Sequence, residues 1–101
     1  MEIKQMQKLS VELLDKINEK MNVTHDIDNM FLSLVEEVGE VARELSRKQR
    51  NYRGEFDKEK LADELADIIT RTAVIAEDNE INLDEAVVSK IEKIKKRFEI
   101  E

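Results

Sequence analysis

Proline is absent from the sequence and glycine occurs only twice, and this scarcity constrains the fold more than any other feature. Both residues interrupt helices and mark most turns and hairpins, so a chain almost without them favours long helices. Apolar residues recur every three or four positions in four segments, as they do along one face of an α-helix. These segments cover residues 1–22, 27–47, 58–77 and 83–98. We therefore predict an all-α fold.

Residues that commonly cap helices stand before three of these segments. Thr24 or Asp26 precedes the second segment, Asp57 the third and Asn82 the fourth. The least periodic and most basic stretch, residues 46–56, is predicted to be a loop. The local signals thus agree with four helices joined by short connections.

Four helices of this length can close a small bundle, and 101 residues suffice for one domain. We predict a four-helix bundle-like single domain over residues 1–101. A domain of this size buries its apolar surface incompletely, so we expect it to assemble as a homodimer or a dimer of dimers. Gly39, inside the second segment, costs about 1 kcal/mol relative to alanine. We therefore expect a neighbouring helix or a cation to pass close to it.

Composition excludes several classes of protein. No cysteine is present, so neither a disulfide framework nor a thiolate metal site is available. A formal net charge of −7 argues against nucleic acid as a partner, because nucleic-acid binding requires a basic face. No stretch is apolar enough for a signal peptide or a membrane span. These features predict a cytoplasmic protein without a membrane partner.

Acidic side chains sit unusually close to the apolar stripes of two predicted helices. At about 100° per residue, Glu36, Glu37 and Glu40 share one sector of the second helix, with Glu37 at the edge of the apolar stripe. Glu64 and Asp67 repeat this arrangement on the third helix, with Glu64 at the edge. Each helix therefore offers an i, i+3 pair of carboxylates.

Such crowding destabilises a helix unless a positive charge compensates it, since like charges repel and partial burial removes hydration. Mg²⁺ prefers carboxylate oxygens, and oxygen ligands without histidine or cysteine select Mg²⁺ or Mn²⁺ over zinc. The alternative is that these acids form ordinary ion pairs on solvated helix faces. The candidate pairs are Asp67–Arg71, Glu40–Arg43 and Glu44–Lys48.

Magnesium held by few carboxylates commonly completes its shell with phosphate oxygens, and phosphates also need positive partners. Lys60, Lys93 and Arg97 are candidates, although each can equally belong to a solvated helix face. His25, the only histidine, has no glutamate three residues before it, so a di-iron bundle with Glu-x-x-His pairs is excluded. We interpret His25 as an exposed linker residue, with a substrate contact as the alternative. No P-loop or glycine-rich fingerprint is present.

The two acidic clusters together form a motif known from one family. Glu36-Glu37-x-x-Glu40 followed by Glu64-x-x-Asp67 resembles the signature of the MazG-like all-α nucleotide pyrophosphohydrolases. The resemblance covers about residues 27–98. It implies an all-helical dimer or tetramer that hydrolyses nucleoside triphosphates, with Mg²⁺, to the monophosphate and pyrophosphate.

The resemblance also implies roles for individual residues. Glu37, Glu40, Glu64 and Asp67 would hold the metal, and Glu36 would orient the attacking water or bind a second ion. Lys60, Lys93 and Arg97 fall where basic residues of the family contact phosphates. The chain has one copy of the motif, whereas longer members carry two domains. It also has no tryptophan, which leaves base stacking to Tyr52, Phe31 or Phe56.

Two other functions remain open at this stage. Related all-α folds hydrolyse dUTP or phosphoribosyl-ATP, and the residues do not separate these substrates. The second alternative is a non-catalytic helical interaction module whose acidic faces meet a basic partner.

Overall fold

The computed structural model describes residues 2–23, 27–49 and 56–101, with the side chains of residues 27 and 28 left out. These residues form four helices and no strand, so the all-α prediction is confirmed. The predicted caps Thr24 and Asp26, the linker residue His25, and Tyr52 in the basic loop lie outside the described residues. The helices are α1 (Ile3–Met21), α2 (Ile27–Gln49), α3 (Lys58–Asp78) and α4 (Leu83–Arg97).

Two of the predicted caps are confirmed by their hydrogen bonds. The Asp57 carboxylate accepts the backbone N–H groups of Glu59 and Lys60 at 2.9 and 3.2 Å. The Asn82 side-chain oxygen accepts the N–H of Glu85 at 3.3 Å. Each side chain satisfies donors that the first turn of a helix leaves without an intrahelical partner.

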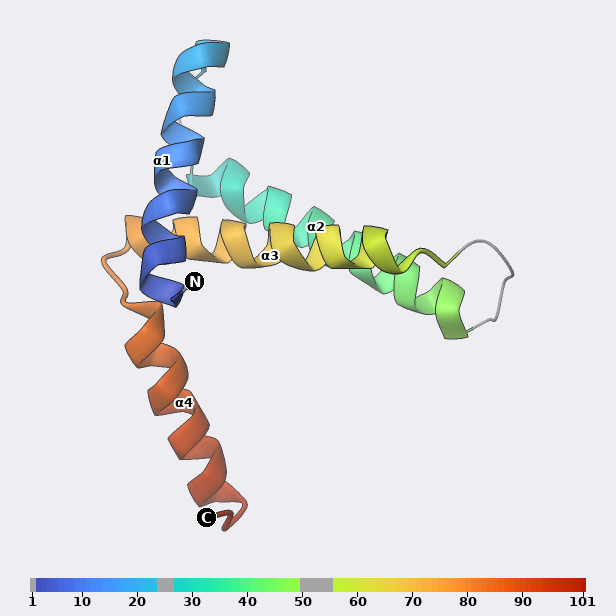
Figure 1. Cartoon of the computed structure of the whole chain (residues 1–101), viewed down its shortest axis with the longest axis vertical. Coiled ribbons are helices and arrows are strands. Elements are labelled where there is room, and N and C mark those ends of the chain that lie inside the picture. Colours follow the sequence, from blue (N-terminus) through green and yellow to red (C-terminus); the bar gives the residue numbers. More distant parts are fainter. Residues whose placement is uncertain (1, 24–26, 50–55) are drawn as a thin grey trace.

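The helices are arranged around α3 (Figure 1). Helix α2 packs antiparallel along α3, and α1 crosses α3 near its C-terminal end. Helix α4 contacts α1 near the N-terminal ends of both and then leads away from α2 and α3. The two helices that carry the acidic motif are therefore direct neighbours.

A buried amide connects α1 to the turn between α3 and α4. The side chain of Gln7 is 1% exposed. Its Nε2 donates to the Ile81 carbonyl at 2.8 Å and to a Glu77 carboxylate oxygen at 3.3 Å. Its Oε1 accepts the N–H of Leu83 at 2.9 Å. These bonds satisfy the buried amide and hold the start of α4 against α1.

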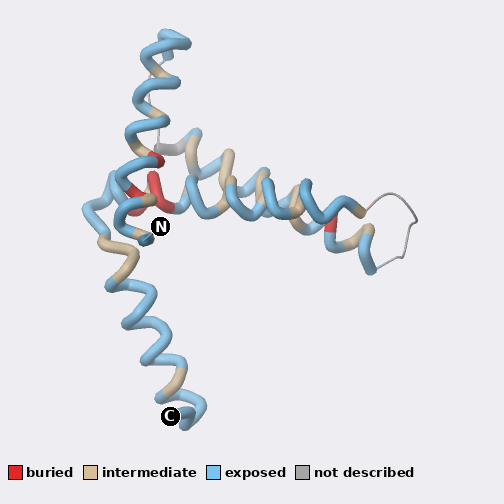
Figure 2. The backbone as a smooth tube through the Cα atoms, viewed as in Figure 1, coloured by how far each residue is buried: buried red, intermediate tan, exposed pale blue. Residues whose placement is uncertain are grey.

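The hydrophobic core of the single chain is small (Figure 2). Among the described residues, the buried apolar side chains are Ala73, Val74 and Ala76 of α3. The accessible surface of the chain is 8251 Å², whereas a compact monomer of 11.8 kDa exposes about 5,900 Å². Its radius of gyration is 16.5 Å, against about 13 Å for a compact domain of this length.

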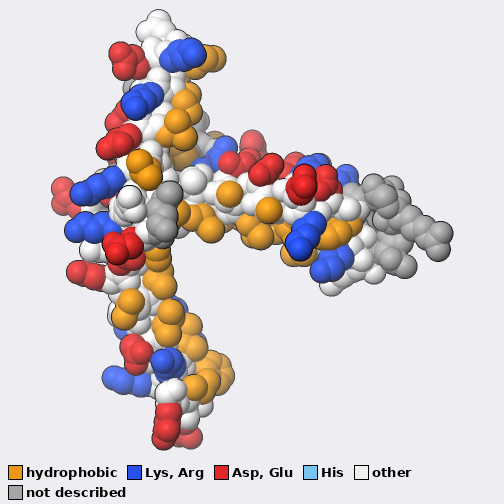
Figure 3. Space-filling model, viewed as in Figure 1, with side chains coloured by type: hydrophobic (Ala, Val, Ile, Leu, Met, Phe, Trp, Pro, Cys, Tyr) orange, Lys and Arg blue, Asp and Glu red, His pale blue; other side chains and the backbone are white. Residues whose placement is uncertain are grey.

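Apolar side chains line exposed faces of several helices (Figure 3). Leu13 of α1, Leu32 of α2 and Val88 of α4 are each at least 60% exposed. Among the described residues, nothing from another element comes within 4 Å of a Cβ atom placed on Gly39. The close neighbour expected at Gly39 is therefore not found in the described part of the single chain. The four helices leave the bundle open on these faces.

Candidate functional site

Three carboxylates of the acidic motif converge between α2 and α3. Glu37 of α2 and Glu64 and Asp67 of α3 each offer an oxygen within 4.8 Å of the others. The i, i+3 spacing places Glu64 and Asp67 on one face of α3, and antiparallel packing brings Glu37 opposite them. Oxygens bound to one Mg²⁺ lie at most about 4.2 Å apart, twice the metal–oxygen bond length. These three residues, called the carboxylate group below, therefore fit a small divalent cation after side-chain shifts of less than about 1 Å.

The electrostatics of the carboxylate group favour an added positive charge. A hydrogen bond shared with Glu37 raises the pKa of Glu64, and partial burial and the charges of Glu37 and Glu40 raise it further. The charge of Lys60 acts in the opposite direction on this pKa and is outweighed. Carboxylates this close require a proton or a cation between them. The raised pKa of Glu64 reflects this unfavourable crowding of negative charge.

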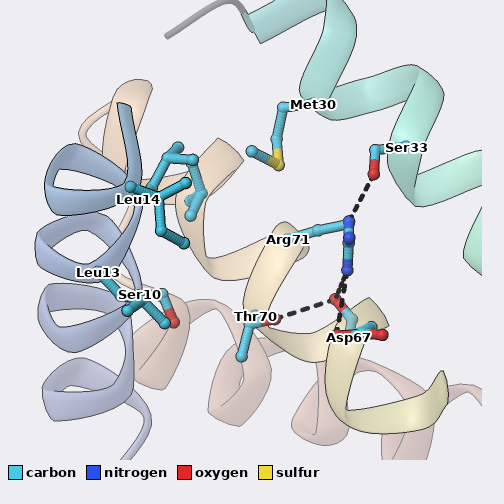
Figure 4. Close-up of a pocket in the computed structure, with 10 residues that line it drawn as sticks. Ser10, Leu13, Leu14, Met30, Ser33, Asp67, Thr70 and Arg71 are labelled. Atoms are coloured by element: carbon cyan, nitrogen blue, oxygen red, sulfur yellow. Dashed lines mark hydrogen bonds and ion pairs between the residues drawn. The ribbon is translucent and has the colours of Figure 1, made fainter. Parts of the chain in front are cut away.

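Arg71 of α3 forms ion pairs with two members of the carboxylate group, and Figure 4 shows the pair with Asp67. Its Nη1 lies 3.3 Å from an Asp67 carboxylate oxygen, and its Nη2 lies 3.7 Å from a Glu37 oxygen. Its Nε donates to the Ser33 hydroxyl at 2.6 Å. Arg71 pairs with two of the three carboxylates, so the group keeps an excess of negative charge that a divalent ion would offset.

The predicted Asp67–Arg71 ion pair is confirmed, but sequence reasoning missed the contacts of Arg71 across the helix pair. The available signal was an arginine one turn after Asp67 and on the same face of α3. That signal indicates a pair within one helix. It contains no information on Ser33 and Glu37, which the packing of α2 brings into reach.

Glu36 and Glu40 lie outside the group of three carboxylates. Glu40 forms the predicted ion pair with Arg43, at 3.3 Å, and its side chain is 34% exposed. Its charge still contributes to the raised pKa of Glu64, so it lies near the group. Glu36 is exposed on α2.

The three basic residues predicted to contact phosphates have different environments. Lys60 lies 3.5 Å from a carboxylate oxygen of Glu44, at the start of α3. Lys93 and Arg97 are exposed on α4, which leads away from α2 and α3 (Figure 1). Within one chain, the structure does not bring Lys93 and Arg97 to the carboxylate group.

A second acidic site on the same helix pair was not expected from the sequence. Glu44 of α2 is 1% exposed, and its carboxylate accepts hydrogen bonds from Arg47 Nη1 at 2.7 Å and the Asp57 N–H at 3.3 Å. Burial raises the pKa of Glu44, but the Asp57 N–H and the charges of Arg47 and Lys60 outweigh burial and lower it overall. Among the described residues, Glu44 pairs with Arg47 and Lys60 rather than with Lys48, whose Nζ lies 5.4 Å from the Phe56 ring centre.

A cavity of about 330 Å³ adjoins the carboxylate group, between α1, α2 and α3 (Figure 4). Leu14, Met30 and Val74 contribute to its apolar walls, and Ser33, Thr70 and Arg71 to its polar side. Asp67 belongs to both the cavity and the carboxylate group. This volume lies at the lower end of small-molecule sites. None of the described lining residues is aromatic, and Phe31 is exposed on α2 outside the lining.

Comparison with known proteins supports the resemblance drawn from the motif. Residues 24–99 match the family model of the MazG nucleotide pyrophosphohydrolase domain. A comparison with curated proteins gave no significant match. No described helix combines the length and apolarity needed to cross a membrane. The matched region contains both acidic clusters and the whole of α2, α3 and α4, so the chain belongs to the MazG nucleotide pyrophosphohydrolase family.

Proposed function

We propose that the protein hydrolyses nucleoside triphosphates to nucleoside monophosphate and pyrophosphate, with Mg²⁺ or Mn²⁺ as cofactor. The observation that carries this proposal is the convergence of Glu37, Glu64 and Asp67 within 4.8 Å, with Arg71 paired to only two of them. These three residues would hold the metal, together with Glu40 one turn from Glu37. The bound ion would neutralise charge on the phosphates.

The protein's own residues would position the reactants. Glu36 and Glu37 orient and deprotonate a water, whose oxygen forms a bond to the α-phosphorus. The bond between that phosphorus and the bridging oxygen breaks, and pyrophosphate leaves. Lys60 binds phosphate oxygens, and the nucleoside occupies the cavity beside Asp67. The aliphatic walls of the cavity exclude water from that part of the substrate.

Self-association is part of this proposal. The single chain exposes roughly 2,300 Å² more than a compact monomer of its mass. If two copies packed together and each covered this excess on the other, the interface would bury roughly 4,600 Å² in total, within the range of obligate dimers. Lys93 and Arg97 can contact phosphates at the carboxylate group only if α4 of one copy packs over α2 and α3 of another. Analytical ultracentrifugation tests this, and a monomer at micromolar concentration would contradict it.

The variants Glu37→Gln and Asp67→Asn test the proposed site. Each removes one proposed ligand charge, and we expect kcat/KM to fall by more than the about 10- to 100-fold that loss of a supporting residue costs. Pyrophosphate release is measured with Mg²⁺ and a panel of nucleoside triphosphates, including dUTP, with phosphoribosyl-ATP assayed alongside. Asp63→Asn, an exposed acid of α3 outside the carboxylate group, is the matched control. Wild-type rates in both site variants, with helicity retained, would refute the assignment.

A further inference from the structure

Arg71 stands at the boundary between the carboxylate group and the cavity (Figure 4). Its side chain is 27% exposed and forms ion pairs with Asp67 and Glu37. Nη1 also lies 3.4 Å from the Asp67 carbonyl oxygen, and Nε donates to Ser33 at 2.6 Å. The bond to Ser33 holds the base of the guanidinium at the cavity wall. The two Nη groups are left facing the carboxylates.

These ion pairs conflict with the binding of a metal at the same carboxylates. Glu37 and Asp67 are two of the three residues that can hold a divalent cation. A guanidinium and a cation held by the same two carboxylates compete for their lone pairs and repel each other. Metal binding would therefore weaken both ion pairs of Arg71 while its bond to Ser33 remains. A partly buried guanidinium in that state favours another anion as its partner.

The cavity provides a place for that anion. We infer that Arg71 exchanges partners. In the metal-free protein it pairs with Glu37 and Asp67, and when the metal is bound it binds a substrate phosphate instead. This inference rests on the proposed function, because the phosphate belongs to a nucleotide whose nucleoside lies in the cavity. The planar fork of arginine matches phosphate oxygens through two parallel hydrogen bonds. Arg71 is thus a substrate-binding residue that also occupies the metal site before the metal arrives.

Partner exchange predicts that loss of Arg71 raises the affinity for the metal and lowers the affinity for a phosphate ligand. Both affinities can be measured without catalytic turnover. Arg71→Gln removes the competitor, so the affinity for Mn²⁺ alone, measured by electron paramagnetic resonance, should rise about 3- to 10-fold. The same variant should bind Mg²⁺-tripolyphosphate about 10-fold or more weakly by calorimetry, because a charged pair of hydrogen bonds is lost. Inorganic tripolyphosphate is the probe because it reports phosphate binding without any preference for a base.

Two further variants separate partner exchange from the general effect of charge. Arg71→Lys keeps the charge but loses the fork and the Nε bond to Ser33, so tripolyphosphate binding should still weaken. Ser33→Ala removes only the anchor and should weaken it about 2- to 5-fold. Arg43→Gln deletes a neighbouring charge on α2 that pairs with Glu40, and should leave tripolyphosphate binding within about 2-fold of wild type.

The outcomes distinguish failure of this inference from failure of the proposed function. If wild-type protein does not bind Mn²⁺, or if Asp67→Asn binds it equally well, the proposed site itself is wrong. If Asp67→Asn abolishes Mn²⁺ binding but Arg71→Gln changes neither affinity, only partner exchange is overturned. A fall in both affinities for Arg71→Gln and Arg71→Lys would assign Arg71 a structural role and also overturn it.

Discussion

Helices α2 and α3 hold two acidic sites that differ in how their charge is compensated. Glu37 and Glu44 are seven residues apart on α2, about 10.5 Å along the helix axis. At the Glu44 site, one carboxylate meets two cationic side chains and a backbone N–H. At the Glu37 site, three carboxylates converge and one guanidinium pairs with two of them. The pKa of Glu44 is accordingly lowered, whereas the pKa of Glu64 is raised.

The comparison shows that burial alone does not identify a functional acid. Glu44 is the more buried residue, at 1% exposure. Its hydrogen bonds and cationic partners stabilise the ionised carboxylate and lower its pKa. The side chain of Glu37 is 18% exposed, yet its site keeps an excess of negative charge. Glu44 therefore stabilises the junction of α2 and α3. The carboxylate group around Glu37 is where we propose that a cation binds.

The largest expected difference between the two sites is in the response to metal. A ligand that binds only the folded state stabilises it by about 2.7 kcal/mol at 100 times its Kd. Mg²⁺ should therefore raise the Tm of wild type and of Glu44→Gln by about 10 °C or more, and leave Glu64→Gln nearly unchanged. Differential scanning calorimetry with and without Mg²⁺ measures this. An equal response of the two variants would remove the functional distinction between the sites.

Without metal, the same two substitutions should change stability in opposite directions. Glu44→Gln leaves Arg47 and Lys60 without their anion and should lower the Tm by about 5 °C or more. Glu64→Gln removes repulsion from Glu37 and Glu40 and should raise the Tm by a few degrees at neutral pH. Thermal melts in chelator, followed by circular dichroism, provide the measurement. A lower Tm for Glu64→Gln would show that its carboxylate is already satisfied.

The pH dependence should follow the opposite pKa shifts. Because the folded-state pKa of Glu44 is below the ordinary value of 4.5, its contribution to stability is present above that pH and is lost as pH falls through the folded pKa. The raised folded-state pKa of Glu64 has the opposite effect: its ionisation destabilises the metal-free fold as pH rises above 4.5. In melts from pH 3 to 8, both variants should approach wild type at the acid end. A constant difference at all pH values would exclude ionisation as the cause.

The smallest expected effect concerns the cap beside Glu44. Asp57→Ala removes the acceptor for two N–H groups of α3 and should lower the free energy of unfolding by about 1 kcal/mol. The backbone N–H that Asp57 donates to Glu44 remains in this variant. Urea unfolding measures the loss, and Mn²⁺ affinity should stay at the wild-type value. A changed Mn²⁺ affinity would mean that the two acidic sites are coupled through α3.

The sequence by itself determined the helices, the caps at Asp57 and Asn82, and the acidic pairs on single helix faces. These features depend on residues within one or two turns of each other, whose spacing the sequence states directly. The pair Asp67–Arg71 was predictable for the same reason.

Only the tertiary structure decided which acids meet. The register of α2 against α3 brings Glu37 to Glu64 and Asp67, leaves Glu36 exposed, and buries Glu44 beside Lys60. The contacts of Gln7 and Lys4 likewise hold the start of α4 against α1, and the course of α4 places Lys93 and Arg97 away from α2 and α3. Such contacts join residues far apart in the chain. They depend on how whole helix faces pack, because no local spacing specifies the register of one helix against another.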